Sequence, residues 1–390
     1  MRIAYICADA GIPVFGQKGC SIHVQEMLRA LQKLGSQVSL FATRLGVEPP
    51  ADLANMTIYR LPAIPKLERS LRERVALAAN PDLRVELELA GSFDLIYERY
   101  SLWSYSGMEY AREKGIPSIL EVNAPLIEEQ AKHRGLVDRE GAECVAKRAF
   151  AAASKIVAVS SQVKDYLTNY VSSEKIQVIA NGVNRDRFSL PLIPSVPIAP
   201  QTFVVGFVGS LKPWHGLSIL TDAFARLHRR VPQARLLIVG DGPERASLEA
   251  DLSARGLQSA VQLTGAVTSK EIPGLLASMS VAVAPYPDRA DFYFSPLKVY
   301  EYMAAGLPVV TSRIGQLAEL IENGTNGILC PPGDAVALAT ALEQLWRSPE
   351  LCTRLGNAAR DAVMQAHTWD AIAKRILTLA DETRLIGGMK

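Results

Sequence analysis

The stretch FVVGFVGSL, residues 203–211, is the first of a series of short apolar runs in the second half of the chain. Further runs follow at 236–239, 261–264, 281–284, 309–311 and 327–330. Helical patterns separate these runs. Buried parallel strands read as nearly continuous apolar runs, and the helices that cross between them carry an apolar stripe. The second half of the chain is therefore predicted to be a doubly wound α/β domain.

The first half repeats this alternation less regularly. Strands are expected at 3–7, 38–42, 95–97, 118–122 and 156–159. The helix after the first strand has an apolar stripe at helical spacing, formed by Val24, Met27, Leu28, Leu31 and Leu34. Residues 190–201 contain four prolines and no charge, which is typical of an extended linker. We therefore expect two domains, 1–189 and 202–368, joined by the linker 190–201.

Composition excludes several classes of function. The 390 residues suit two domains, and a net charge of +2 gives no basis for nucleic-acid binding. No apolar run is long enough to span a membrane, and Met1–Cys7 leads straight into a strand, so we expect a cytoplasmic protein without a signal peptide. The five cysteines, without a close pair, fit reduced thiols, and the five scattered histidines show no metal-ligand spacing.

The stretch FSPLKVYEYMAAGLPVV, residues 294–310, has the features of an anion site. Ser295 is expected to cap a helix that begins at Pro296, and the free N–H groups of such a start favour phosphate. Lys298 and Glu301 share one helix face. Glu301 would lie roughly 7 Å along the axis from the helix start, where a carboxylate can accept from both hydroxyls of a ribose. The alternative is an ordinary amphipathic helix with Lys298 and Glu301 as a solvated pair.

This segment resembles the signature helix of the family-four retaining glycosyltransferases. Other stretches resemble motifs of that family and follow its order: GQKGCSIHV (16–24), IVAVSS (156–161), VIANGV (178–183), VGFVGSL (205–211), LIVGDGP (237–243), LTG (263–265) and NGTNG (323–327). The resemblance implies the GT-B fold: two facing Rossmann-like doubly wound α/β domains with an interdomain cleft. The first would serve the acceptor and the second the nucleotide sugar, and the amphipathic segment 369–390 would cross back to the first domain.

In the family, two basic residues stabilise the diphosphate leaving group without a metal. This chain departs from that pattern, because Ser210 follows Gly209 and His215 precedes Gly216 where relatives have an arginine and a lysine. Lys298 and Lys212 are the available cations. Lys298 is the stronger candidate, because a helix start already favours anions. His215 would help if protonated, or it packs beside Trp214.

Other donor contacts follow from the same resemblance. Glu301 takes the place of the ribose-binding glutamate, whereas Tyr293 stands where relatives have a first glutamate near the donor sugar. Asp291 would substitute for it only after a loop shift. The remaining expected donor-binding groups are Gly19, Gly209, Ser210, Lys212, His215, Gly265 and the segment Phe294, Ser295, Pro296 and Leu297.

The sequence indicates the acceptor-binding residues less clearly than the donor-binding ones. Asn123 follows a strand that should face the cleft, near the place of a family histidine, and is our candidate catalytic residue together with Lys298. Tyr97, Glu98 and Arg99 end another strand, although Glu98 and Arg99 would alternatively pair with each other. A basic excess at Arg60, Lys66, Arg69, Arg72, Arg74 and Arg84 is either a solvated helical face or a segment that contacts anionic lipid at the inner membrane surface.

The resemblance as a whole implies a metal-independent, cofactor-free glycosyltransferase, with hexose transfer as the expected activity. It would move a sugar by front-face attack from a nucleotide sugar, a uridine one by base rate, to a carbohydrate, lipid-linked or small-molecule acceptor. A nucleotide-sugar epimerase of the same fold and a degenerate transferase that only binds remain alternatives. A nicotinamide oxidoreductase is disfavoured, because Gly11, Gly16 and Gly19 lack the spacing of the dinucleotide fingerprint.

Overall fold

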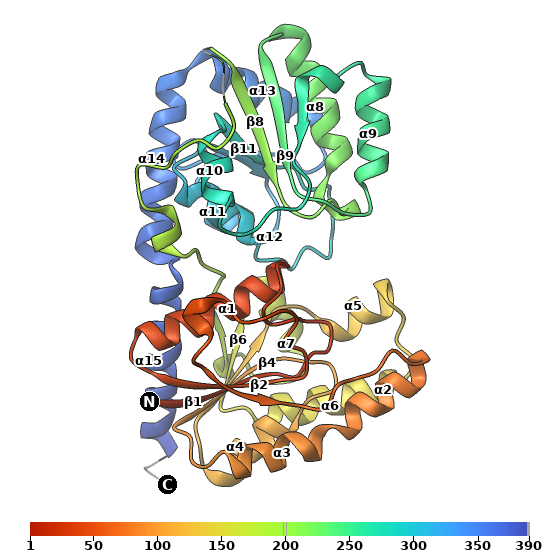
Figure 1. The fold of residues 1–390 in the computed structure, drawn as a ribbon, viewed down its shortest axis with the longest axis vertical. Coiled ribbons are helices and arrows are strands. Elements are labelled where there is room, and N and C mark those ends of the chain that lie inside the picture. Colours follow the sequence, from red (N-terminus) through yellow and green to blue (C-terminus); the bar gives the residue numbers. More distant parts are fainter. Residues whose placement is uncertain (198, 200, 388–390) are drawn as a thin grey trace. The chain divides into compact units, whose positions relative to one another are not determined.

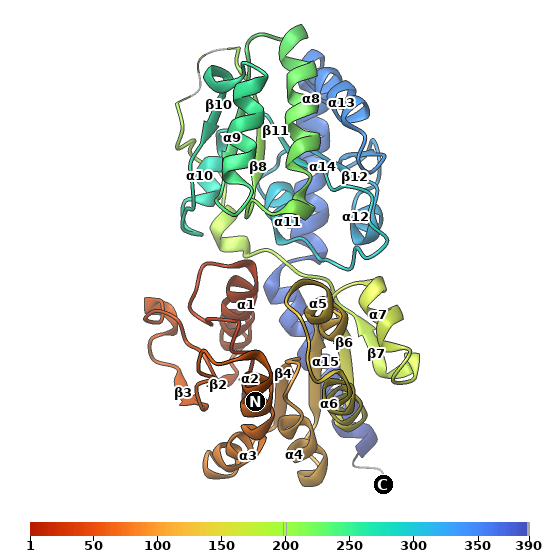
Figure 2. The same cartoon turned by 90° about the vertical axis from the view of Figure 1, so that its right-hand side faces the viewer.

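A computed structural model describes residues 1–197, 199 and 201–387. The chain divides into two compact units (Figures 1 and 2). The first comprises Met1–Asn181, Tyr293–Ser295 and the C-terminal segment from Trp369, and the second comprises Gly182–Phe292 and Pro296–Thr368. Both units are Rossmann-like, as predicted, because each is built on a parallel sheet with helices between consecutive strands.

The division of the chain differs from the predicted domain ranges at the proline-rich segment. The border lies between Asn181 and Gly182, so the described part of 190–201 belongs to the second unit. Two hydrogen bonds tie it there: the Ser195 N–H donates to the Gly274 carbonyl (3.0 Å) and the Val196 N–H donates to the Ser278 hydroxyl (3.0 Å). Proline content gave no indication of the surface on which this segment lies.

The sheet of the first unit has the strand order β3-β2-β1-β4-β5-β6-β7, with every neighbour parallel. Its strands are β1 (Arg2–Cys7), β2 (Gln37–Ala42), β3 (Thr57–Arg60), β4 (Leu95–Arg99), β5 (Ser118–Val122), β6 (Lys155–Ala158) and β7 (Ile176–Val178). The two edge strands, β3 and β7, were not predicted, because they are short and only partly buried and so lack a continuous apolar run.

The helices of the first unit are α1 (Gly19–Lys33), α2 (Arg69–Ala78), α3 (Asn80–Leu89), α4 (Ser106–Lys114), α5 (Leu126–His133), α6 (Arg139–Ala152), α7 (Ser161–Leu167) and α15 (Trp369–Gly387). The predicted stripe of α1 is buried, and α15 packs beside this helix (Figure 1). Lys33 forms an ion pair with Asp370 (2.7 Å), and the rings of His23 and Trp369 meet edge to face with centroids 4.9 Å apart.

The sheet of the second unit has the strand order β10-β9-β8-β11-β12-β13, again with parallel neighbours. Its strands are β8 (Phe203–Val208), β9 (Ala234–Val239), β10 (Val261–Leu263), β11 (Val281–Ala284), β12 (Val309–Ser312) and β13 (Ile328–Cys330). All six predicted runs form strands. The central ones are buried on both faces, which is why they read as continuous apolar segments.

The helices of the second unit flank this sheet (Figure 2). They are α8 (Leu217–Arg230), α9 (Arg245–Ala254), α10 (Ile272–Ala277), α11 (Leu297–Ala304), α12 (Gly315–Leu320), α13 (Ala335–Arg347) and α14 (Pro349–Ala366). α8 packs against α13, and α11 packs against α14. Among the described residues, no helix has both the length and the apolar character needed to cross a membrane.

Each sheet has one place where the winding direction reverses. In the first unit this switch point lies between β1 and β4, and in the second unit it lies between β8 and β11. Open parallel sheets bind ligands at the carboxyl ends of the strands that flank such a point. The topology therefore gives each unit its own candidate ligand site.

Candidate functional site

The switch point of the second unit is formed where the chain leaves β8 and enters Gly209. This glycine has φ of +147°, and a Cβ there would lie 2.8 Å from the Lys298 Nζ. A Cβ on Gly240, which follows β9, would lie 2.0 Å from the Gly209 carbonyl oxygen. Glycine at both positions therefore lets two strand ends and the amine of Lys298 approach closely.

Gly265 continues this row of glycines. It follows β10, and its carbonyl accepts a hydrogen bond from the Gly240 N–H (3.0 Å). The structure thus brings the predicted donor-binding residues Gly209 and Gly265 to one edge of the sheet, with Gly240 between them. This edge offers backbone instead of side chains, as close approach to a diphosphate requires.

Lys298, in the first turn of α11, carries a buried amine without a hydrogen-bond partner among the residues that the structure describes. Its Nζ lies 4.3 Å from the ring centroid of Phe207 and 5.5 Å from that of Tyr286. Burial lowers the pKa of Lys298 to about 7. The alternative in which Lys298 and Glu301 form a solvated pair is therefore wrong, since the amine is buried beside Phe207, Tyr286 and Gly209.

His215 lies beside this lysine, at the end of the short 3-10 helix η4 (Pro213–His215). Its Nδ1 is 2.5 Å from the Ser210 carbonyl oxygen, so the ring donates from Nδ1 and keeps Nε2 as an acceptor. Burial and the charge of Lys298 lower the pKa of His215 to about 3. The idea that a protonated His215 replaces a family cation is therefore not supported, because the ring is neutral near neutral pH.

The two other predicted residues of this loop are more accessible. Ser210 is exposed, and Lys212 is partly buried with its Nζ 5.7 Å from the ring centroid of Trp214. Lys212 is therefore a cation at the surface of the same loop, whereas Lys298 is the buried one. The structure brings Gly209, Ser210, His215 and Lys298 together as one cluster.

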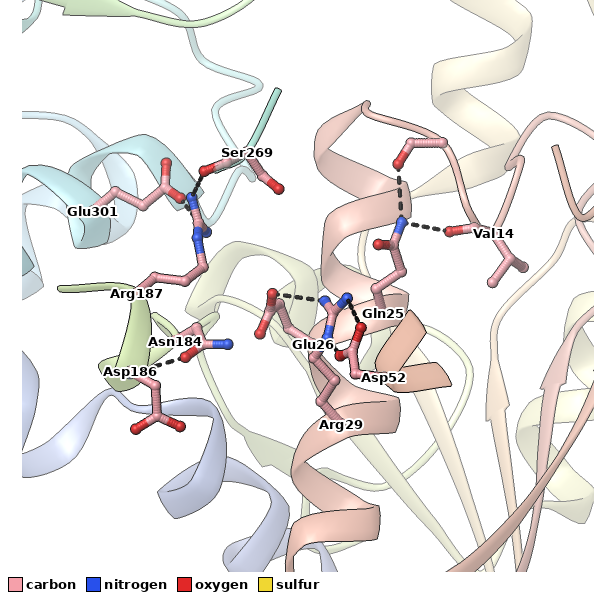
Figure 3. A network of polar contacts seen from close by, with 11 residues as sticks. Val14, Gln25, Glu26, Arg29, Asp52, Asn184, Asp186, Arg187, Ser269 and Glu301 are labelled. Carbon is pink, nitrogen blue, oxygen red and sulfur yellow. Dashed lines mark hydrogen bonds and ion pairs between the residues drawn. The ribbon is translucent and has the colours of Figure 1, made fainter. Parts of the chain in front are cut away.

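Glu301 is oriented by an arginine that the sequence analysis did not single out. The Nη1 of Arg187 donates to a carboxylate oxygen of Glu301 (2.9 Å), and its Nη2 donates to the Ser269 carbonyl oxygen (2.5 Å; Figure 3). Arg187 lies in the 3-10 helix η3 (Arg185–Phe188), directly after the VIANGV motif. Its place just after a recognised motif is the only sequence feature that could have indicated a role for Arg187.

The start of α11 differs from the prediction. The helix begins at Leu297, its N-cap is Pro296, and no side chain caps it. The Ser295 hydroxyl instead accepts a hydrogen bond from the Asn181 N–H (3.0 Å), and its carbonyl accepts one from the Asn181 side chain (2.7 Å). The prediction that Ser295 caps this helix is wrong, because Asn181 engages both oxygens of that serine.

Tyr293 and Phe294 belong to the first unit together with Ser295. The Tyr293 hydroxyl donates to Glu129 (2.8 Å), and its carbonyl accepts from the Ser160 hydroxyl (2.8 Å). The rings of Tyr293 and Phe294 lie against each other, with centroids 4.4 Å apart. Asp291, suggested as a substitute for the missing glutamate, is engaged by Arg289 through two contacts of 2.9 Å.

In the first unit, Glu121 near the end of β5 is the centre of a buried polar network. One carboxylate oxygen lies 2.6 Å from His23 Nε2 and accepts a hydrogen bond from the Asn123 amide (3.0 Å). The other oxygen accepts a hydrogen bond from the Tyr97 hydroxyl (2.7 Å). Burial raises the pKa of Glu121, but the charges of His23 and Arg99 and these hydrogen bonds outweigh it and lower the pKa to about 2. Asn123 is thereby fixed in orientation.

The alternative in which Glu98 pairs with Arg99 is wrong. The two side chains are adjacent in β4 and so point to opposite faces of the sheet. Glu98 accepts a hydrogen bond from the Ser104 hydroxyl (2.5 Å), whereas the charge of Arg99 acts on Glu121. Burial raises the pKa of Glu98 to about 7.

Gly19 is the exposed first residue of α1, and no side chain caps that helix. The loop before it is held by Gln25, whose amide donates to the carbonyls of Val14 and Gly16 (both 2.9 Å; Figure 3). The first N–H groups of α1 therefore remain available to an anion. Within the described ranges, no three His, Cys, Asp or Glu side chains gather as ligands of a metal ion would.

Comparisons with known proteins agree with this geometry. Residues 18–187 match the family model described as Glycosyltransferase Family 4, and residues 202–348 match the model described as Glycosyl transferases group 1. The MMP alpha-(1->4)-mannosyltransferase of Mycolicibacterium hassiacum is 27% identical over 98% of both chains. The alpha-D-kanosaminyltransferase of Streptomyces kanamyceticus is 32% identical over 40% of this chain and 39% of its own length.

A solved structure shows the same fold. HepE from Anabaena, determined in complex with UDP and glucose, superposes with a TM-score of 0.73 at 20% identity and covers 97% of this chain and 98% of its own. At this identity the likeness concerns the fold, which is the two-domain GT-B architecture.

Proposed function

This chain belongs to glycosyltransferase family 4, and on that premise we propose that it transfers a sugar from a nucleotide diphosphate sugar to a hydroxyl acceptor with retention of configuration. It is a glycosyltransferase by family. The donor, the stereochemistry and the independence from metal are our proposals. HepE, which has this fold, was determined with UDP and glucose, and this supports a uridine donor.

The observation that carries the proposal is the buried amine of Lys298. It lies beside the glycine row at the carboxyl ends of β8, β9 and β10 and has no anionic partner among the described residues. A buried cation without a partner is costly, and a bound diphosphate would supply the missing charge. Glu301, oriented by Arg187, would then accept hydrogen bonds from the ribose hydroxyls.

The proposed reaction breaks the bond between the anomeric carbon of the sugar and an oxygen of the diphosphate. A new bond forms on the same face between that carbon and the hydroxyl oxygen of the acceptor, and the hydroxyl proton passes to the leaving phosphate oxygen. Lys298 would stabilise the charge that develops on this oxygen. The proposed step uses side chains and backbone N–H groups and needs neither a metal ion nor a cofactor.

The test is an incubation with a panel of radiolabelled nucleotide sugars and hydroxyl acceptors in the presence of excess EDTA. We expect the label to move to an acceptor, or slowly to free sugar when no acceptor is added. Label in an isomerised nucleotide sugar would instead identify an epimerase. Bound but unchanged label would identify a binding protein, and activity that requires added magnesium or manganese would contradict the metal-independent reaction.

A further inference from the structure

The first unit has a cavity of about 450 Å³ at its switch point. It lies at the carboxyl ends of the central strands, since Ala8–Gly11 follow β1, Thr43 follows β2 and Ser101–Ser104 follow β4. The helices α2, α3 and α5 and the segment before α2 contribute most of the rest of its wall. Both the position and the volume are those of small-molecule sites in open parallel sheets.

Two of the arginines that line this cavity have guanidinium groups without a partner among the described residues. Arg69 and Arg72 lie one turn apart on α2, both are exposed, and neither side chain forms a hydrogen bond or ion pair with another residue that the structure describes. Arg84, farther along the basic segment, is by contrast held by Glu88 (3.2 Å) and Glu113 (2.6 Å). The solvated-face interpretation therefore fits Arg84, whereas Arg69 and Arg72 keep their donors for a ligand.

The cavity also contains three carboxylates, and protein groups engage each of them. Glu73 accepts from the N–H groups of Val137 (3.1 Å) and Asp138 (2.8 Å). Asp9 accepts from the Gly11 N–H (2.7 Å). Glu129 accepts from the Tyr293 hydroxyl (2.8 Å) and from Arg134 (3.0 Å). The donors of these carboxylates come from other parts of the protein, so Arg69 and Arg72 are not engaged by them.

Part of the remaining wall is apolar and exposed. Ile64 and Leu67 come from the segment before α2, and Leu67 keeps 40% of its surface exposed. Leu102 and Trp103 contribute from the loop after β4. An apolar surface next to arginine donors fits a ligand that has both an apolar body and an anionic group.

We propose that this cavity binds the sugar acceptor, and that the acceptor is a small molecule with an apolar body and a phosphate or carboxylate group held by Arg69 and Arg72. The identification of this ligand as the sugar acceptor rests on the proposed transferase function. The anionic ligand and its arginine partners can nevertheless be tested without any donor.

The probe is 1-naphthyl phosphate, with uncharged 1-naphthol as its matched control, titrated against the full chain by fluorescence in the presence of saturating UDP. We expect the phosphate to bind at least about tenfold more tightly than the naphthol. The double variant Arg69→Met, Arg72→Met should lose at least about tenfold of the phosphate affinity. Arg74→Met, on the same helix but outside the cavity, should bind like the parent.

Further measurements distinguish this proposal from the proposed transferase function and from binding to a membrane surface. Thermal melting of each variant shows that folding is intact. Phosphate binding that is lost in the double variant but survives Lys298→Met belongs to the first unit, so it stands even if the transferase assay fails. Equal affinity of the two naphthalene probes, or of parent and double variant, would overturn the proposal. Binding to vesicles of equal phosphatidylglycerol and phosphatidylcholine, without binding of 1-naphthyl phosphate, would also overturn it in favour of a membrane surface.

Discussion

Glu121 in the first unit and Lys298 in the second are both buried charges near the ends of parallel strands, yet their surroundings differ. The Glu121 carboxylate receives donors from His23, Tyr97 and Asn123. The Lys298 amine meets two aromatic rings and has no hydrogen-bond partner among the described residues. The pKa of Glu121 is lowered because its surroundings stabilise the charged form. The pKa of Lys298 is lowered because burial destabilises its charged form. The first charge is completed by the fold, whereas the described residues supply no such partner to the second.

The largest loss of stability is expected from removing the Glu121 carboxylate, whose charge the surrounding side chains stabilise. Glu121→Ala leaves His23 and Arg99 buried without their counter-charge, and breaking a buried pair in this way costs about 3–5 kcal/mol of unfolding free energy. The measurement is denaturant unfolding, with UDP affinity as a second readout that should stay at the parental value. Glu128→Ala is the matched control. Its exposed ion pair with Arg139 should contribute little to stability, because solvent screens it. Equal stability of both variants would contradict the comparison.

Lys298→Met should give the reverse result, with stability kept and activity lost. Methionine retains most of the aliphatic length, so we expect a melting temperature no lower than that of the parent. Turnover should fall by about a hundredfold or more, because one charge-assisted contact to the leaving group is gone. Lys212→Met, which removes the more accessible cation, is the control and should have the smaller effect. Parental turnover in Lys298→Met would move the phosphate site toward Lys212 or the glycine row.

The buried carboxyl of Glu98 extends the comparison to the pH dependence of stability. Burial raises the pKa of Glu98 to about 7, above its value in the unfolded chain. The unfolded state then loses its proton first, so stability falls as pH rises from about 5 to 7. We expect a loss of about 1–3 kcal/mol over this range in the parent. Glu98→Gln cannot ionise and should lack this part of the slope in urea unfolding. Identical slopes would show that Glu98 is ionised throughout.

The second sheet could be predicted from sequence almost strand by strand, because strands buried on both faces need continuous apolar runs. Helix α11 and the position of Lys298 could also be predicted. The isolation of Lys298 from polar partners could not be predicted, since it depends on the ring of Phe207, which is distant in the chain, and on that of Tyr286, which lies across the loop before α11. The Arg187 contact to Glu301 is likewise a tertiary contact that spacing does not encode.

Two errors have simple physical causes. Ser295 has the side chain of a good N-cap, but the Asn181 N–H competes for it, and a distant partner is invisible in local sequence. The suggested pairing of Glu98 with Arg99 could have been rejected from sequence, because neighbours in a strand point to opposite faces. Local pattern therefore predicted the backbone well and the partners of polar side chains poorly.

The association of α15 with the first unit also sets an order of events during synthesis. The strand β1 and helix α1 leave the ribosome first, but the Trp369 ring that meets His23 is made only after the whole second unit. The three-residue segment Tyr293–Ser295 arrives in between. The second unit, which depends on no segment before Gly182, can reach its native core while the first still waits for its last helix. The half of the enzyme whose translation begins first therefore cannot be complete before the last helix of the chain is made.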